Sequence, residues 1–234
     1  MPNQSLSAAA YSELRSRITR LQIPPGTSFT EREIASDLGL SKTPVREALS
    51  RLRQEDLVII DPAAGYRSSD VTIKDTWDLF ALRVLLEGEA AGQAAGQALH
   101  LPCLRQMEEL CDRRYSPADA ASVDAFLEAN TRFHLAIGKA AGNRRLEAIL
   151  EVVLVQMERL FRIGLMLSSR SDDIVHEHRE LLEAIVSGDA SRARKVAVAQ
   201  VRASQKMVID AMVSSAEITT RPIGLTRLEV ARHG

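Results

Sequence analysis

The chain has 234 residues, of which 45% are hydrophobic, 26% are charged and 4% are aromatic, and its formal net charge is -1. This length accommodates two modest domains or one large one, and the frequent alanine, leucine and arginine favour helices over sheets. No apolar run approaches the roughly 20 residues that a membrane-spanning helix requires. The N-terminus lacks the cationic start and long apolar stretch of a secretory signal. We therefore expect a cytoplasmic protein without a membrane partner.

Three short helices are predicted in the N-terminal part of the chain. Apolar residues at spacings of three and four favour a first helix over residues 8–21. Thr30 and Glu33 have the spacing of a capping box, which predicts the start of a second helix, and Gly39 is placed to end it. Ser41 is placed to begin a third helix after a tight turn, which predicts a helix-turn-helix.

The third helix is locally basic, although the N-terminal part as a whole is neutral. Residues 1–70 hold nine Lys or Arg and nine Asp or Glu. Around the third helix, four cations stand against one acid: Lys42, Arg46, Arg51 and Arg53 against Glu47. A local basic face is sufficient for DNA binding, but without further context it is more typical of a solvated helix surface.

The rest of the chain predicts a hairpin and then helices. An apolar run at residues 57–60, a break at residues 61–65 and the following segment 66–71 predict a β-hairpin that adds a wing to the helix-turn-helix. From residue 72 onward only helical periodicity is found, and the short connections predict an antiparallel bundle. The six predicted helices span residues 75–98, 102–114, 117–141, 143–167, 172–186 and 189–213.

The expected fold is therefore mainly α. We predict a winged helix-turn-helix over residues 1–71, a six-helix antiparallel bundle over residues 72–214 and a C-terminal tail over residues 215–234. Cys103 and Cys111 lie eight residues apart on a predicted helix, about 12 Å along its axis, which is too far for a disulfide. We interpret these cysteines as ordinary small apolar residues.

Specific sequence strings in both parts of the chain match a known pattern. In the N-terminal part they are Pro25-Gly26, Glu33-Ile34-Ala35, the segment from Leu38 to Leu49, Leu52, Leu57-Val58 and Gly65. In the helical part they are Leu82-Arg83, Leu86-Glu87, Asn130, Phe133-His134, Gly142-Asn143, Glu177-His178 and Gly188-Asp189. With these strings the chain resembles the GntR family of bacterial regulators, in particular its FadR-like (FCD) branch, over nearly its whole length.

The resemblance implies that the start of the third helix contacts base edges in double-stranded operator DNA, where its free N–H groups and dipole also favour phosphate. Arg46 lies one turn into this helix and has the planar fork that binds O6 and N7 of guanine. Lys42 stands where the family usually has arginine, and it offers a point charge in place of that fork. Gly65 would bring the wing tip to the minor groove. The implied contact residues are Arg32, Ser41, Lys42, Thr43, Arg46, Gly65 and Arg67.

The resemblance also implies a polar site in the helical part. In many FCD proteins an Asp or Asn, a His four residues later and two further His hold a divalent metal. Asn130 and His134 have this spacing, His178 follows on a later helix, and Gln200 stands where the third His is expected. An amide oxygen binds zinc or nickel less well than an imidazole does. We therefore expect a weakened metal site at Asn130, His134 and His178, with Gln200 joining these three in an effector pocket.

Two further residues of this part have alternative interpretations. Arg83 aligns with an arginine that often meets the carboxylate of the effector, although it could instead form a salt bridge with Glu87, four residues later on the same helix. His176 is two residues from His178 and points about 200° around the helix from it. We therefore expect His176 to face solvent and not to replace the missing histidine.

These features predict a ligand-responsive transcriptional regulator, a repressor that reads a pseudo-palindromic operator as a homodimer and responds to a small organic acid. One alternative is an architectural DNA-binding protein without an effector. A second alternative is a helical metalloenzyme fused to a DNA-binding module. We do not expect an enzyme, because the chain has neither the paired Glu-x-x-His of a di-iron site nor an H-E-x-x-H motif.

Overall fold

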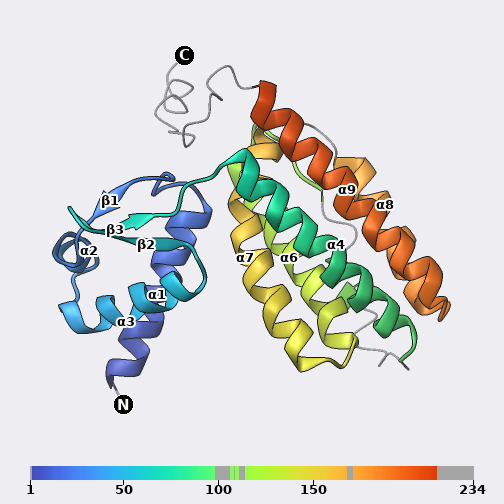
Figure 1. The fold of residues 1–234 in the computed structure, drawn as a ribbon, viewed down its shortest axis with the longest axis horizontal. Helices are drawn as coiled ribbons and strands as arrows, with labels where there is room; N and C mark the ends of the chain where they lie inside the picture. Colours follow the sequence, from blue (N-terminus) through green and yellow to red (C-terminus); the bar gives the residue numbers. More distant parts are fainter. Residues whose placement is uncertain (1, 98–105, 108, 111–113, 168–170, 215–234) are drawn as a thin grey trace. The chain divides into compact units, whose positions relative to one another are not determined.

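The computed structural model describes residues 2–97, 106–107, 109–110, 114–167 and 171–214, and Figure 1 shows their arrangement. The described residues form two compact units, one that ends at Thr72 and one that begins at Ile73. The predicted fold class is confirmed, since the first unit combines a helix-turn-helix with a small antiparallel sheet and the second is helical. Among the described helices, none is both long enough and apolar enough to cross a membrane.

The first unit contains three helices and three short strands. The helices are α1 (Pro2–Thr19), α2 (Glu31–Leu38) and α3 (Lys42–Gln54), and the strands are β1 (Ser28–Phe29), β2 (Val58–Asp61) and β3 (Gly65–Ser68). The sheet is antiparallel in the order β1-β3-β2. Leu14 and Ile18 of α1 are fully buried, as are Leu49 and Leu52 of α3. The packing of α1 on α3 therefore forms the core that supports the helix-turn-helix.

Local sequence signals begin and end α2 as predicted. The side chain of Thr30 accepts a hydrogen bond from the backbone N–H of Glu33, and the carboxylate of Glu33 accepts one from the backbone N–H of Thr30. Gly39 ends α2 with a φ of 65°, a left-handed conformation that glycine adopts without steric cost. Ser41 is the N-cap of α3, but its side chain makes no capping hydrogen bond, so its hydroxyl remains on the exposed surface.

Several details of the first unit differ from the prediction. Helix α1 begins at Pro2 and not at residue 8, since a proline is tolerated in the first turn of a helix. Helix α1 ends at Thr19 and not at residue 21, because Leu21 adopts a φ of 61°, and the backbone N–H groups of Gln22 and Ile23 bond back to the carbonyl of Arg17. Strand β1 was not predicted, since two residues are too few to show the alternation of a strand. It nevertheless adds a third strand beside the wing hairpin.

The second unit contains five long helices among its described residues. They are α4 (Ile73–Ala95), α6 (Ala120–Ala140), α7 (Arg144–Leu167), α8 (Ser171–Val186) and α9 (Ala190–Ser214). Helices α4 and α9 lie side by side in Figure 1. Two glycines of α4 lie at this contact, and a Cβ at Gly92 would displace the flexible side chain of Arg194. Gly88 is similarly close, at 3.0 Å from Cγ2 of Val198 to the place of a Cβ.

The core of the second unit lies between these helices. Phe133 of α6, Leu150 and Leu154 of α7 and Leu181 of α8 are buried in it. Of the helix predicted over residues 102–114, the described residues 106–107 and 109–110 are helical, and two of them contribute buried side chains to the same core. Both cysteines and the predicted tail at residues 215–234 lie outside the described residues.

Candidate functional sites

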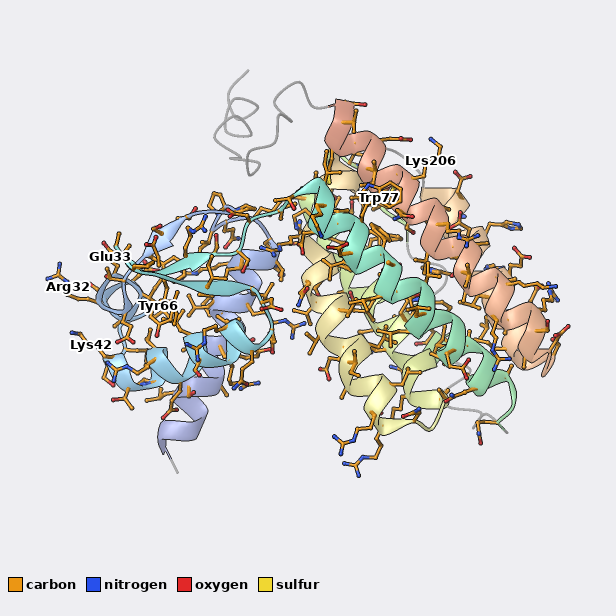
Figure 2. All side chains as sticks on the ribbon, viewed as in Figure 1. Arg32, Glu33, Lys42, Tyr66, Trp77 and Lys206 are labelled. Atoms are coloured by element: carbon orange, nitrogen blue, oxygen red, sulfur yellow. The ribbon has the colours of Figure 1, made fainter. Side chains whose placement is uncertain are left out.

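The first candidate site is the exposed surface around the start of α3. Ser41, Lys42 and Thr43 are all exposed there, and Arg32 is exposed on α2. Figure 2 shows the side chains of Arg32 and Lys42 extending outward from this end of the first unit. The structure therefore places four of the implied DNA contacts on accessible surface. Their role in DNA binding stays a prediction.

Arg46, also on α3, is exposed and held in a fixed geometry. Its Nε donates to one carboxylate oxygen of Glu31 and its Nη2 to the other, each at 2.9 Å. The hydroxyl of Tyr66, on β3, donates to the same carboxylate at 3.3 Å. Hydrogen bonds from Arg46 hold the pKa of Glu31 below its usual range. The sequence analysis did not identify Glu31, because the two side chains meet across two helices and lie 15 positions apart.

The wing residues lie on β3 and at its start. Gly65 is exposed and has a φ of 92°, which favours glycine at this turn. Arg67 is only partly exposed, and its Nη1 donates to Asp70 at 2.9 and 3.1 Å. A phosphate contact by Arg67 would therefore compete with Asp70 for the guanidinium.

The second candidate site is a closed pocket in the helical unit. Arg83, Asn130, His134, His178 and Gln200 all line it, and none is more than 8% exposed. They come from α4, α6, α8 and α9. The structure thus brings together all five residues implied as effector contacts. The free volume is only about 10 Å³, which is close to the space that one water molecule requires.

The buried carboxylate of Glu87 contacts two of these five residues. Nε of Arg83 donates to Oε1 of Glu87, so the salt bridge that the sequence offered as the alternative role of Arg83 is present. Nδ1 of His134 lies 2.9 Å from Oε2 of Glu87. Burial raises the pKa of Glu87, but its interactions with Arg83 and His134 lower it further, to about 2. Glu87 therefore carries a negative charge inside the bundle.

The remaining members of the cluster are polar but carry no counter-charge. Burial, together with the nearby His134, holds the pKa of His178 well below its usual range, so that this ring is neutral near pH 7. Nε2 of Gln200 donates to the backbone carbonyl of Glu177, which orients the amide. His176 is exposed, as predicted. Neither Nη1 of Arg83 nor Oε1 of Gln200 has a hydrogen-bond partner in the described part of the chain, although both atoms are buried.

The same residues can be tested as metal ligands. The ring centres of His134 and His178 are 5.4 Å apart, a separation that two imidazoles bound to one ion could adopt, given metal–nitrogen distances of about 2.0–2.1 Å. However, the other donors are the neutral amides of Asn130 and Gln200, and the carboxylate that contacts His134, that of Glu87, is already paired with Arg83. Within the described residues there is no cluster of three His, Cys, Asp or Glu that could hold an ion. This donor set does not fit a tightly bound transition metal.

The fold and the two sites together define a class of protein: a winged helix-turn-helix DNA-binding protein with a helical effector domain. Residues 6–67 match "Bacterial regulatory proteins, gntR family", and residues 78–203 match the FCD domain. This chain therefore belongs to the GntR family of bacterial transcriptional regulators, with an FCD effector-binding domain.

Individual relatives agree with this assignment. The uncharacterized HTH-type regulator BphR of Paraburkholderia xenovorans is 26% identical over 211 residues, which cover 88% of this chain and 86% of BphR. The HTH-type transcriptional repressor RspR of Escherichia coli is 22% identical over 194 residues, or 83% of this chain and 85% of RspR. The structure of E. coli McbR/YncC covers 88% of this chain and 97% of its own at a TM-score of 0.71 and 20% identity. That structural likeness supports the fold.

Proposed function

We propose that this regulator is a repressor whose helical domain binds a small organic acid and thereby changes its affinity for operator DNA. The observation that carries the proposal is the closed polar pocket, in which Nη1 of Arg83 and Oε1 of Gln200 are buried without a partner. A buried polar atom without a hydrogen bond is costly. A ligand that satisfies both atoms is therefore stabilised in the pocket.

The two atoms indicate the chemistry of the ligand. A guanidinium nitrogen binds a carboxylate strongly because the hydrogen bond is charge-assisted. The carbonyl oxygen of Gln200 accepts a hydrogen bond, and a hydroxyl group on the ligand can donate it. A hydroxy acid or sugar acid carries both groups, and the neutral His178 adds a further polar partner.

The small free volume of the pocket suggests how binding is coupled to DNA. An organic acid needs more than the about 10 Å³ that the closed pocket provides, so side chains or helices around it must move apart. A ligand that binds the widened state alone shifts the protein toward that state by its differential affinity. The name of RspR supports the sign of regulation, since that relative is described as a repressor.

A thermal-shift screen tests the effector proposal. The full-length protein is heated with small carboxylic, hydroxy and sugar acids, each with and without a chelator, and active compounds are then added to complexes with an operator duplex selected from a random pool. We expect an acid that raises the melting temperature without added metal and that changes the affinity for the duplex. If no acid shifts the melting temperature, the effector role is wrong and the architectural alternative is favoured.

A matched pair of variants assigns the effect to the pocket. Gln200→Glu places a negative charge in the pocket, which repels the carboxylate of the acid. This variant should therefore abolish the rise in melting temperature that the acid causes. Gln205→Glu, on the same helix but outside the pocket lining, adds the same charge and should preserve the shift. Equal loss in both variants would contradict binding at this pocket.

We also propose that the protein acts as a homodimer on a pseudo-palindromic site, because one recognition helix reads few bases and a two-fold protein requires matched half-sites. Light scattering of the full-length chain, alone and bound to the selected duplex, measures the stoichiometry. A monomer that binds a single half-site tightly would contradict the proposal.

A further inference from the structure

The ion pair between Arg46 and Glu31 uses only one edge of the guanidinium. A guanidinium has five N–H donors in a planar fork. Glu31 takes the edge formed by Nε and Nη2, at 2.9 Å to each nitrogen. The edge formed by Nη1 and Nη2 faces away from the carboxylate, and the Arg46 side chain is 66% exposed, against 20% for Glu31. Arg46 is thus fixed at one edge and accessible at the other.

The carboxylate of Glu31 is itself held in place. Glu31 is the first residue of α2 and lies inside the capping box of Thr30 and Glu33 that fixes the start of this helix. Tyr66 donates its hydroxyl to the same carboxylate, and its ring stacks on Phe29 with centroids 6.5 Å apart. One acidic side chain therefore links α2, the recognition helix α3 and the wing strand β3, and Figure 2 shows Tyr66 at the same end of the unit as Arg32 and Lys42.

We infer that Glu31 is a positioning residue for DNA recognition, which orients Arg46 so that its free edge meets a guanine. This inference rests on the proposed role of Arg46 as a base-reading residue. An arginine side chain that is free to rotate loses conformational entropy when it binds a base. Because Glu31 restricts Arg46 before DNA arrives, less entropy is lost on binding to the correct base.

The opposite role for Glu31 predicts the opposite change in operator affinity when the carboxylate is removed. If the carboxylate competed with DNA for Arg46, its removal would free the guanidinium and strengthen operator binding. Removing any acid from a DNA-binding face also reduces repulsion of the phosphates, which strengthens binding to all sequences alike. The positioning role alone predicts that removal of the carboxylate weakens the preference for the operator over other DNA.

Glu31→Gln tests the direction in which the operator preference changes, because glutamine keeps the shape of the glutamate side chain but has one acceptor oxygen and no charge. Affinities are measured by fluorescence anisotropy for the operator duplex selected by the wild-type protein and for a scrambled duplex of equal length. We expect the ratio of the two affinities to fall about threefold to tenfold, while binding to scrambled DNA becomes slightly tighter. Glu47→Gln is the matched control, since it removes an exposed acid from the same motif, and it should leave the ratio unchanged.

A double-mutant cycle separates positioning from a structural effect. In an Arg46→Ala background, Glu31→Gln should no longer change the ratio, because there is no guanidinium left to position. A structural role for Glu31 would persist in that background. A ratio that is unchanged or higher in Glu31→Gln alone, or an equal loss with and without Arg46, would overturn the inference.

The same experiment tests the proposed role of Arg46 independently. Arg46→Ala alone should lower the ratio about 5- to 150-fold, the range of a bidentate contact to a base. If Arg46→Ala leaves the ratio unchanged, the role of Arg46 itself is wrong. If Arg46→Ala lowers the ratio and Glu31→Gln does not, only the positioning role is wrong. Tyr66→Phe, which removes one hydroxyl from the cluster, should lower the ratio in the same direction by a smaller factor.

Discussion

The chain contains the same ion pair in two different environments. In the first unit Arg46 pairs with Glu31 at the surface, and in the second Arg83 pairs with Glu87 inside the helical bundle. Water competes for both members of the surface pair, and such pairs contribute little to stability. The buried pair has lost its hydration, so each member depends on the other. The same chemistry therefore orients a side chain in one unit and maintains the fold of a pocket in the other.

The comparison also indicates which additional partner each arginine can bind. Arg46 has an accessible edge that can add a base without breaking its ion pair. Arg83 is 1% exposed and has an unsatisfied Nη1, so a ligand that reaches it adds a hydrogen bond where none exists. In both cases a glutamate holds part of a guanidinium, and another N–H group of the same guanidinium remains for a partner.

The largest expected effect is a loss of stability when a substitution breaks the buried pair. Arg83→Ala leaves the carboxylate of Glu87 buried without its main counter-charge, which should lower the free energy of unfolding by about 3–5 kcal/mol. Arg46→Ala should leave stability almost unchanged, because its pair is exposed. Urea denaturation of each variant measures the difference, followed by far-ultraviolet circular dichroism for both helical units and by the fluorescence of Trp77 on α4 for the second unit. Trp77 is the single tryptophan of the chain and lies on the same helix as Arg83.

A second variant shows whether the loss comes from the buried charge. Combining Arg83→Ala with Glu87→Gln removes the uncompensated carboxylate and should restore part of the lost stability. Similar stabilities for Arg83→Ala and Arg46→Ala would mean that burial does not distinguish the two pairs.

Sequence reasoning predicted those features of the fold that depend on local signals. The capping box at Thr30, the left-handed Gly39 and the periodicity of the long helices all act within a few residues of one another. Strand β1 was missed because its pairing with β3 is determined by contacts about 40 positions away. The end of α1 was placed two residues too late, because apolar periodicity continues to Leu21 while the backbone already turns.

The two sites also show that sequence reasoning misses contacts between residues far apart in the chain. The family resemblance named five of the residues that line the closed pocket, and their functional roles remain a prediction. It did not indicate that Glu87 also contacts His134, which lies 47 positions away, nor that Glu31 holds Arg46. Both glutamates act through contacts between helices, which a single sequence does not reveal.

A smaller effect is expected when an imidazole is added to the pocket. Gln200→His would provide a third imidazole near His134 and His178, and imidazole is a better ligand for zinc or nickel than an amide oxygen. We predict an increase of at least about tenfold in metal affinity, or about 1.4 kcal/mol, by calorimetry on chelator-treated protein. The wild type should bind these ions weakly, since two of its four donors, Asn130 and Gln200, are amides. Stoichiometric metal that survives chelation in the wild type would contradict this view of the pocket.

The smallest expected effect concerns a third pair of intermediate exposure, Arg67 with Asp70. Their side chains are 32% and 25% exposed, so the pair lies between the two extremes compared above. If Arg67 contacts a phosphate, Arg67→Ala should weaken binding to operator and scrambled duplexes equally and lower the slope of log affinity against log salt by at most about one. Asp70→Asn should have the opposite effect, because it releases the guanidinium for the phosphate and removes a negative charge. Titrations at several salt concentrations measure both slopes. A change in the ratio of operator to scrambled affinity in Arg67→Ala would show that Arg67 reads sequence, and unchanged slopes in both variants would place the wing arginine outside the DNA interface.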